Sequence, residues 1–115
     1  MKAKKWGEID AERMNPLIVR QALHTSNMTI ARIGLAKGAI VPLHQHTNEQ
    51  ITMLESGRLR FVLGDEEVVI NGGDLLEIPP GVPHQVEALE DSLATDLFAP
   101  RREDWIRGDD AYLRR

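Results

Sequence analysis

The sequence predicts an all-β protein that folds as one β-sandwich or barrel domain. Its 115 residues suit a single domain, because domains commonly hold about 100–200 residues. Over residues 17–100, runs rich in Val, Ile, Leu and Thr are interrupted by Gly, Pro, Asn and Asp about every 8–12 residues. Apolar residues occupy every second position from Leu59 to Leu63, with Arg58 and Arg60 on the other face. Roughly eight or nine short antiparallel strands of this kind indicate a sandwich or barrel.

We expect the barrel to span residues 17–100, after an N-terminal arm at residues 1–16 that is loosely held and ends at the turn signal Asn15-Pro16. Further turn signals separate the later strands at Gly64-Asp65, Asn71-Gly72-Gly73 and Pro79-Pro80-Gly81. The candidate strands, in order, are Leu17–Leu23, Met28–Leu35, Ile40–His46, Gln50–Glu55, Gly57–Leu63, Glu67–Ile70, Asp74–Ile78, His84–Ala88 and Leu93–Phe98.

Two segments are less regular than the rest. Between Met28 and Leu35, Ile30 and Ile33 break the alternation, so we expect a bulge or a displaced strand boundary there. Residues 101–115 form a C-terminal tail of mixed charge, which we expect to be partly disordered or helical. Its apolar residues have at best helical spacing; they are Trp105, Ile106, Tyr112 and Leu113.

Composition excludes several classes of function. The absence of cysteine excludes a disulfide scaffold, a Cys-based zinc site, an iron–sulfur cluster and a thiol nucleophile. With 14 basic and 18 acidic residues the net charge is −4, which argues against a general nucleic-acid or anionic-membrane binder. Apolar stretches of about five residues fall far short of the ~20 that a transmembrane helix needs. No apolar segment follows the basic N-terminus, so we expect a cytoplasmic protein.

The histidines are the main chemical asset of the sequence. His44 and His46 lie two residues apart in one candidate strand, so both imidazoles point to the same face, about 6–7 Å apart at Cα. If that face is the barrel interior, bare imidazoles there need a partner, and a divalent metal ion is the economical one. The alternative is a pair of surface histidines on an outward face. His24 lies in a polar turn and is expected to have a surface or capping role.

The surroundings of these histidines resemble the paired motifs of the cupin family. The matching positions are Gly38, His44, His46, Gln50 and Gly57 in the first motif, and Gly73, Pro79, Gly81 and His84 in the second. The resemblance implies a single-domain cupin, a jelly-roll barrel also described as a double-stranded β-helix. It also implies one divalent transition metal ion, Ni, Zn, Co, Mn or Fe, held by His44, His46, Gln50 and His84.

The sequence departs from the cupin pattern at Gln50, where the family usually has Glu, and at Ala88, where it usually has Asn. An amide supplies a carbonyl oxygen but no charge, so the ion keeps its full +2. We infer a stronger Lewis acid with weaker metal retention, which favours polarising an oxygen-rich ligand over oxygenase chemistry. Alternatively, water takes the place of Gln50, or Glu49 ligates the ion, although the alternation points Glu49 out of the barrel.

Polar residues at the end of the last strand indicate what binds beside the metal. Asp96 and Phe98 share a face, and Arg102 follows the turn at Pro100. A carboxylate, an aromatic ring and a guanidinium beside a Lewis acid suit an acidic sugar, because Arg pairs with a carboxylate in a bidentate fork. Alternatively, Asp96 points outward, Phe98 belongs to the core and Arg102 lies on a solvated turn.

A closer resemblance is to the pectin-degradation cupins called KdgF. It rests on the segments 44–51, 63–66, 78–84 and 96–104 and extends from about Asn27 to Trp105. That family has His, His, Gln and His at the metal, which accounts for Gln50. The resemblance implies conversion of 4,5-unsaturated uronate monosaccharides, from pectin or alginate, to linear 5-keto-4-deoxyuronate. It assigns catalysis to Asp96 and Arg102 and substrate binding to Phe98 and Arg102. Apart from the resemblance, we expect Arg60, a further basic residue at the mouth, to bind substrate as well.

Three other functions compete with this one. They are a metal-dependent cupin oxygenase, a non-catalytic sugar-acid-binding cupin, and a sugar-phosphate isomerase-like cupin, which would need more basic residues at the mouth. By resemblance we expect the protein to form a homodimer. We expect its small-molecule partner to be an acidic sugar. Three aromatic residues either serve the dimer interface or cap the barrel ends: Trp6, Trp105 and Tyr112.

Overall fold

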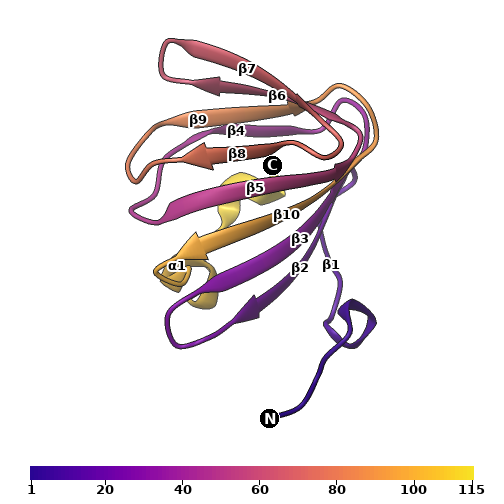
Figure 1. The fold of residues 1–115 in the computed structure, drawn as a ribbon, viewed down its shortest axis with the longest axis vertical. Helices are drawn as coiled ribbons and strands as arrows, with labels where there is room; N and C mark the ends of the chain where they lie inside the picture. The colour runs from indigo at the N-terminus through magenta and orange to yellow at the C-terminus, as the bar shows by residue number, and fades with distance from the viewer.

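A computed structural model describes residues 1–115 and shows two antiparallel sheets that face each other (Figure 1). The strands are β1 Glu12–Asn15, β2 Ile18–His24, β3 Thr29–Leu35, β4 Ile40–His44, β5 Glu49–Ser56, β6 Arg58–Leu63, β7 Glu66–Asn71, β8 Leu75–Ile78, β9 His84–Ala88 and β10 Ser92–Ala99. The six-stranded sheet has the order β1-β2-β3-β10-β5-β8, and the four-stranded sheet has the order β4-β9-β6-β7. The predicted all-β jelly-roll is confirmed.

Strand β3 shows why its sequence is hard to interpret. Its residues alternate between buried and half-buried positions along the whole strand, and its pairing with β2 and β10 has no register shift. The bulge expected between Met28 and Leu35 is therefore absent, and the strand begins one residue later, at Thr29. Ile33 faces the core while Ile30 lies on the outer face. Apolar residues on both faces hide the alternation that the backbone follows.

The core fills the space between the sheets with apolar side chains from both. Leu54 and Ile78 come from the six-stranded sheet, and Leu59 and Phe61 from the four-stranded sheet; all four are almost fully buried. Burial of this kind contributes about 1.5–3 kcal/mol for each large apolar side chain. This packed core lies directly below the polar residues at the mouth of the barrel and supports the strands that carry them.

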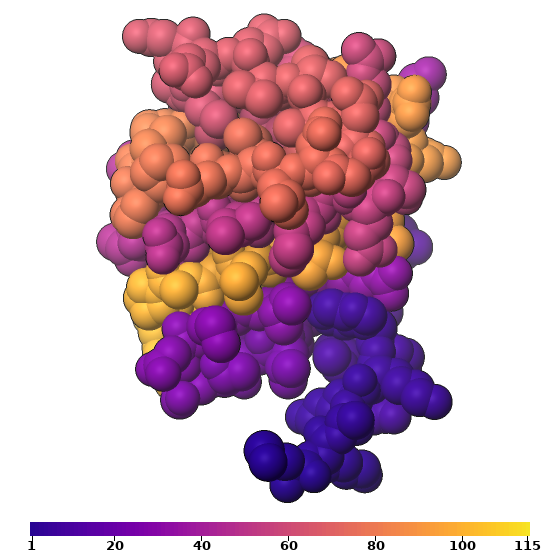
Figure 2. Space-filling view, viewed as in Figure 1, coloured from indigo at the N-terminus to yellow at the C-terminus, as the bar shows by residue number.

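The N-terminal arm is only partly free of the barrel. Residues 12–15 of the expected arm form β1, which pairs with β2. A short 3-10 helix, η1 Trp6–Glu8, precedes it. Figures 1 and 2 show the first residues, in indigo, projecting away from the rest of the molecule.

The C-terminal tail is folded and returns to the barrel. It contains α1 Glu103–Ile106 and the 3-10 helix η2 Ala111–Arg114, and it buries Trp105 and Leu113. Helix η2 contacts both β1 and β4, so it bridges the two sheets. The tail is helical in part, as one of the two expectations had it, and it packs against the mouth instead of hanging free. None of the helices has the length and apolar character that crossing a membrane requires.

A polar network fixes the tail to the first two strands. The carboxylate of Asp110, only 2 % exposed, accepts a hydrogen bond from Arg20 Nη2 at 2.8 Å and one from Arg114 Nε at 3.1 Å. Arg114 also pairs with Glu12. Asn15 Nδ2 donates to the backbone carbonyls of the last residues. A buried carboxylate with two cationic partners is well satisfied, so this network holds the tail in place.

Candidate metal centre

The three histidines predicted as ligands come together at the mouth of the barrel. His44 is the last residue of β4 and His84 the first residue of β9, and the pairing of these strands places them opposite each other. His46 follows two residues later, outside the strand. The ring centroids lie 4.2 Å apart for His44 and His84, 5.0 Å for His46 and His84, and 5.7 Å for His44 and His46. One ring nitrogen of each lies within 4.8 Å of the others.

Backbone carbonyls determine which nitrogen of each ring faces the centre. The Nδ1 atoms lie near the carbonyl oxygens of Pro42 (2.8 Å, His44), Asn48 (3.0 Å, His46) and Val82 (2.9 Å, His84). A carbonyl oxygen only accepts, so each Nδ1 carries the proton and donates, and each Nε2 keeps its lone pair. The Nε2 atom of His84 is buried and has no hydrogen-bond partner. An orphaned acceptor of this kind suits a metal ion.

Gln50 adds an oxygen atom to the three nitrogens. It lies on β5, and its Oε1 atom is 3.0 Å from His46 Nε2. Its Nε2 atom donates to Thr52 Oγ1 at 2.9 Å, and that hydroxyl donates to Asp96 Oδ1 at 2.7 Å. Two acceptor atoms about 3 Å apart repel each other, but this is the spacing of neighbouring ligands that lie about 2.1 Å from a shared ion. Three imidazole nitrogens and one amide oxygen therefore fit a divalent transition metal.

Burial keeps these ligands uncharged. It lowers the pKa of His44 to about 3 and that of His46 to about 4, and it also lowers the pKa of His84. Neutral imidazole is the form that binds metal. Burial has the opposite effect on the carboxyl group of Asp96, since it raises its pKa to about 6, while the hydrogen bond from Thr52 and the charge of Arg102 oppose the shift.

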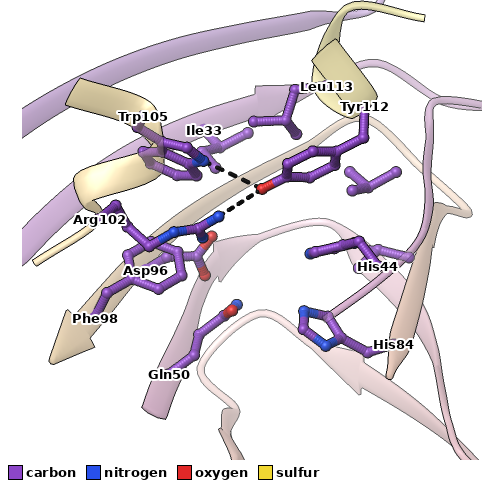
Figure 3. A pocket seen from close by; sticks show the side chains of 12 residues that line it. Ile33, His44, Gln50, His84, Asp96, Phe98, Arg102, Trp105, Tyr112 and Leu113 are labelled. Carbon is purple, nitrogen blue, oxygen red and sulfur yellow. Dashed lines mark hydrogen bonds between the residues drawn. The ribbon is translucent and has the colours of Figure 1, made fainter. Parts of the chain in front are cut away.

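A cavity of about 50 Å³ lies beside this centre and brings most of the predicted site residues together (Figure 3). His44, Gln50 and His84 line it, and so do the three residues predicted to meet the substrate, Asp96, Phe98 and Arg102. His46 lines a neighbouring hollow of about 360 Å³ between the segments 45–48 and 100–107. Asp96 faces inward, so the alternative of an outward carboxylate is wrong.

Arg102 lies in the cavity wall and not over the mouth. Its side chain is 1 % exposed, and its Nε and Nη2 atoms donate to the carboxylate of Asp104 at 3.0 and 2.8 Å. Nη2 also donates to the hydroxyl of Tyr112 at 2.8 Å. The guanidinium lies over the rings of Phe98 and Trp105, at 4.7 and 4.3 Å from the centroids. These contacts fix its orientation and leave Nη1 as the nitrogen without a partner in the chain.

The structure does not bring Arg60 to this site. Leu59 and Phe61 face the core, so the alternation of β6 places Arg60 on the outer face of the sheet. There it pairs with Glu67 at 3.2 Å and with Glu87 at 3.4 Å, on the two neighbouring strands. Its assignment as a substrate-binding residue is therefore wrong, and the alternation that excludes it was already visible in the sequence.

The structure also places the other residues considered from the sequence. Glu49 is exposed and faces away from the histidines. His24 was expected in a polar turn, but it is the half-buried last residue of β2 and contacts Thr29 through Nδ1 at 2.7 Å, apart from the three histidines. Trp105 and Tyr112 line the cavity and so cap the barrel mouth, whereas Trp6 lies near Arg32 on the outside.

Sequence reasoning missed two contributors to the site. Thr52 lies two residues after Gln50 on the same face of β5, so the period of a strand was sufficient to find it. Tyr112 stacks on His44, with centroids 4.4 Å apart and an interplanar angle of 24°. Nothing in the local sequence indicates that the C-terminal tail returns to the mouth of the barrel. The spacing of the apolar residues in the tail therefore does not place Tyr112 at the candidate metal centre.

Comparisons with known proteins agree with this fold. The cupin domain model matches residues 31–98. The structure of KdgF from Halomonas sp. aligns with a TM-score of 0.80 and 33 % identity, over 86 % of this chain and 94 % of that one. An RmlC-like cupin from Shewanella frigidimarina aligns with a TM-score of 0.83 and 25 % identity, over 91 % and 96 % of the two chains. An uncharacterised protein of Streptomyces coelicolor is 28 % identical over 102 residues, 87 % of this chain and 97 % of its own length.

Proposed function

We propose that this chain, which belongs to the cupin family, is a metal-dependent enzyme that converts 4,5-unsaturated uronate monosaccharides to linear 5-keto-4-deoxyuronate. One observation carries the proposal. The cavity beside the three histidines and Gln50 also contains Asp96, Phe98 and Arg102, the set that the likeness to KdgF implies. Four neutral ligands, a buried carboxyl group and a buried guanidinium suit an anionic, oxygen-rich substrate.

The metal would be held by His44, His46, Gln50 and His84, and nickel, zinc, cobalt, manganese and iron all accept such a donor set. When bound, a divalent ion would polarise an oxygen atom of the sugar. The backbone carbonyls behind the three rings keep them oriented for that ion.

The reaction is an isomerisation that needs proton transfer but no oxidant and no water. The substrate is a cyclic hemiacetal with a C4–C5 double bond. When the bond between C1 and the ring oxygen breaks, the anomeric hydroxyl loses its proton and C1 becomes an aldehyde. The enolate that is released becomes a ketone at C5 when C4 gains a proton. The net change moves one proton from the anomeric hydroxyl to C4.

Asp96 is the residue that we assign to this proton transfer. It is a buried carboxyl group in the wall of the cavity, and Thr52 holds it by one oxygen atom. Its carboxylate would take the proton from the anomeric hydroxyl, and the resulting acid would deliver one to C4. General acid–base catalysis of this kind commonly contributes about 10²–10⁴ in rate.

Arg102 and Phe98 would bind the substrate carboxylate and ring. The Nη1 atom of Arg102 would donate to the carboxylate, while Asp104 and the ring of Phe98 keep the guanidinium in place. The cavity, at about 50 Å³, is much smaller than the neighbouring hollow of about 360 Å³. We therefore place the reacting end of the sugar in the cavity and the rest toward the hollow lined by His46 and Asp104.

The test follows the ultraviolet absorbance of the conjugated alkene in an unsaturated galacturonate. Metal-loaded wild-type protein should accelerate its decay, and Asp96→Asn should reduce the rate by about 10²-fold or more. Arg102→Lys should raise KM, because it removes the planar fork. Arg60→Ala is the matched control, since it removes an arginine outside the cavity and should leave the decay unchanged. If the decay with Asp96→Asn equals that of the wild type, the proposed function is wrong.

Two further measurements on the metal-loaded protein address the competing functions. Tight uronate binding without decay would identify a sugar-acid-binding cupin, and oxygen uptake with bound iron would identify an oxygenase. We also propose that the protein is a homodimer in the cytoplasm, as the family likeness suggests. Sedimentation equilibrium measures its mass, and a monomer at micromolar concentration would contradict the dimer.

A further inference from the structure

Tyr112 is a polar residue at the metal centre that the proposed function has not used. It lies on η2, and its ring stacks on that of His44. Figure 3 shows its hydroxyl between Arg102 and Trp105, above the carboxyl group of Asp96 and across the cavity from Gln50. Sixteen residues separate Tyr112 from Asp96 in the sequence, and the fold of the tail brings them to the same cavity.

The hydrogen bonds of this hydroxyl leave its proton unused. Arg102 Nη2 lies 2.8 Å from the phenolic oxygen and Trp105 Nε1 lies 3.1 Å from it. Guanidinium and indole nitrogens only donate, so the oxygen accepts both bonds. The phenolic proton goes to neither neighbour, and no hydrogen bond in the structure has Tyr112 as donor. Accepting a bond from a cation also makes an O–H group a stronger donor.

The tail holds Tyr112 in this position. The two residues that follow it on η2 are fixed, Leu113 by burial and Arg114 by ion pairs with Asp110 and Glu12. Asp110 in turn forms a buried pair with Arg20 at 2.8 Å. An oriented donor held by a rigid network, beside a cavity and with no acceptor, is suited to an oxygen atom of a bound molecule.

We propose that Tyr112 is a substrate-contacting residue of this site and that its phenolic O–H group donates a hydrogen bond to an oxygen atom of the bound uronate. The inference rests on the proposed function, which supplies the ligand class. Together with Arg102 Nη1, the hydroxyl gives the cavity two donors on one wall, opposite the ligands of the metal. These two donors favour a ligand that has two acceptor oxygen atoms close together, as a sugar acid does.

The test is Tyr112→Phe, which keeps the ring stacked on His44 and removes the O–H group. The probe is galacturonate, which has the carboxylate and ring hydroxyls but no double bond to react. Its Kd for zinc-loaded protein is measured by calorimetry and should rise about three- to tenfold, the effect of one hydrogen bond. The value of kcat/KM for the unsaturated substrate should fall at least as much. The Kd for zinc should not change. The melting temperature should fall by several degrees, because Arg102 Nη2 and Trp105 Nε1 each lose an acceptor.

Asp109→Asn is the control, because it alters an exposed residue of the same tail and should change none of these quantities. Equal galacturonate affinity and equal kcat/KM in Tyr112→Phe and wild type would overturn the inference and leave the proposed function standing. A parallel loss of zinc affinity would also overturn it, since Tyr112 would then act through His44 and the metal ligands and not on the bound sugar acid. A wild-type protein that neither binds galacturonate nor converts the unsaturated uronate would overturn both.

Discussion

Thr52→Val tests whether one hydroxyl group links the metal ligands to the proton-transfer residue. Thr52 is 1 % exposed, and Val has nearly its shape. The hydroxyl accepts a hydrogen bond from Gln50 Nε2 and donates one to Asp96 Oδ1. The substitution therefore removes a partner from two buried polar groups at once and leaves the backbone of β5 unchanged.

The expected effects follow from those two bonds. Each buried polar group left without a partner costs about 1–3 kcal/mol, so the free energy of unfolding should fall by about 2–6 kcal/mol. The amide of Gln50 also loses the contact that directs its carbonyl oxygen toward His46. Removing an oriented partner behind a metal ligand commonly weakens metal affinity about 10–100-fold. The hydrogen bond from Thr52 lowers the pKa of Asp96, so that pKa should rise in the variant.

The measurements are urea unfolding of the metal-free protein and zinc calorimetry. Thr95→Val is a matched control, because Thr95 is also buried but its hydroxyl donates to Glu55 on the outer face. It should leave zinc affinity unchanged. Thr52→Ser keeps the hydroxyl and should restore most of the affinity. Zinc affinity of Thr52→Val equal to that of the wild type would refute the role assigned to this hydroxyl.

Two further perturbations test the metal centre and the tail. At a metal concentration of 100 times Kd, binding contributes about 2.7 kcal/mol, so a chelator should lower the melting temperature of the wild type by roughly 10 °C. It should leave His84→Ala unaffected, and an equal fall in both proteins would contradict the site. Although burial opposes it, the hydrogen bonds from Arg114 and Arg20 hold the pKa of Asp110 below its ordinary value. This stabilisation is complete above about pH 4 and is lost as the pH falls through the lowered pKa. Asp110→Asn should therefore be less stable than the wild type at pH 7 and should lose less stability in acid. Unfolding followed by circular dichroism at each pH measures both effects. Acid curves of equal slope in the two proteins would argue against the Asp110 network.

The grouping of His44, His46 and His84 followed from the resemblance to the cupin motifs, whose spacing reflects strand geometry. Turns at fixed intervals determine where β4 and β9 begin and end, and antiparallel pairing then places His44 opposite His84. The same period of two that identified Asp96 and Phe98 as neighbours also excludes Arg60, which lies between two core residues. That error came from treating a basic residue as part of the mouth before assigning its face.

The surroundings of Arg102 were not predictable from local sequence. Its partners Asp104, Trp105 and Tyr112 belong to a tail whose path depends on the buried pair of Asp110 with Arg20. That pair joins residues 90 positions apart, and no periodicity indicates such a contact. The sequence places Arg102 after the turn at Pro100, but its burial and its fixed partners depend on tertiary structure.

The amide at position 50 and the carboxyl at position 96 depend on each other chemically. Thr52 has a single hydroxyl proton, which it gives to Asp96, so its oxygen can only accept from position 50. Gln50 supplies the required N–H, whereas an ionised Glu would place a third acceptor against an oxygen atom that has no proton left. Such a Glu would also add a second negative charge close to Asp96. Gln50, where cupins usually have Glu, therefore allows one threonine to contact both a residue of the candidate metal centre and a buried acid.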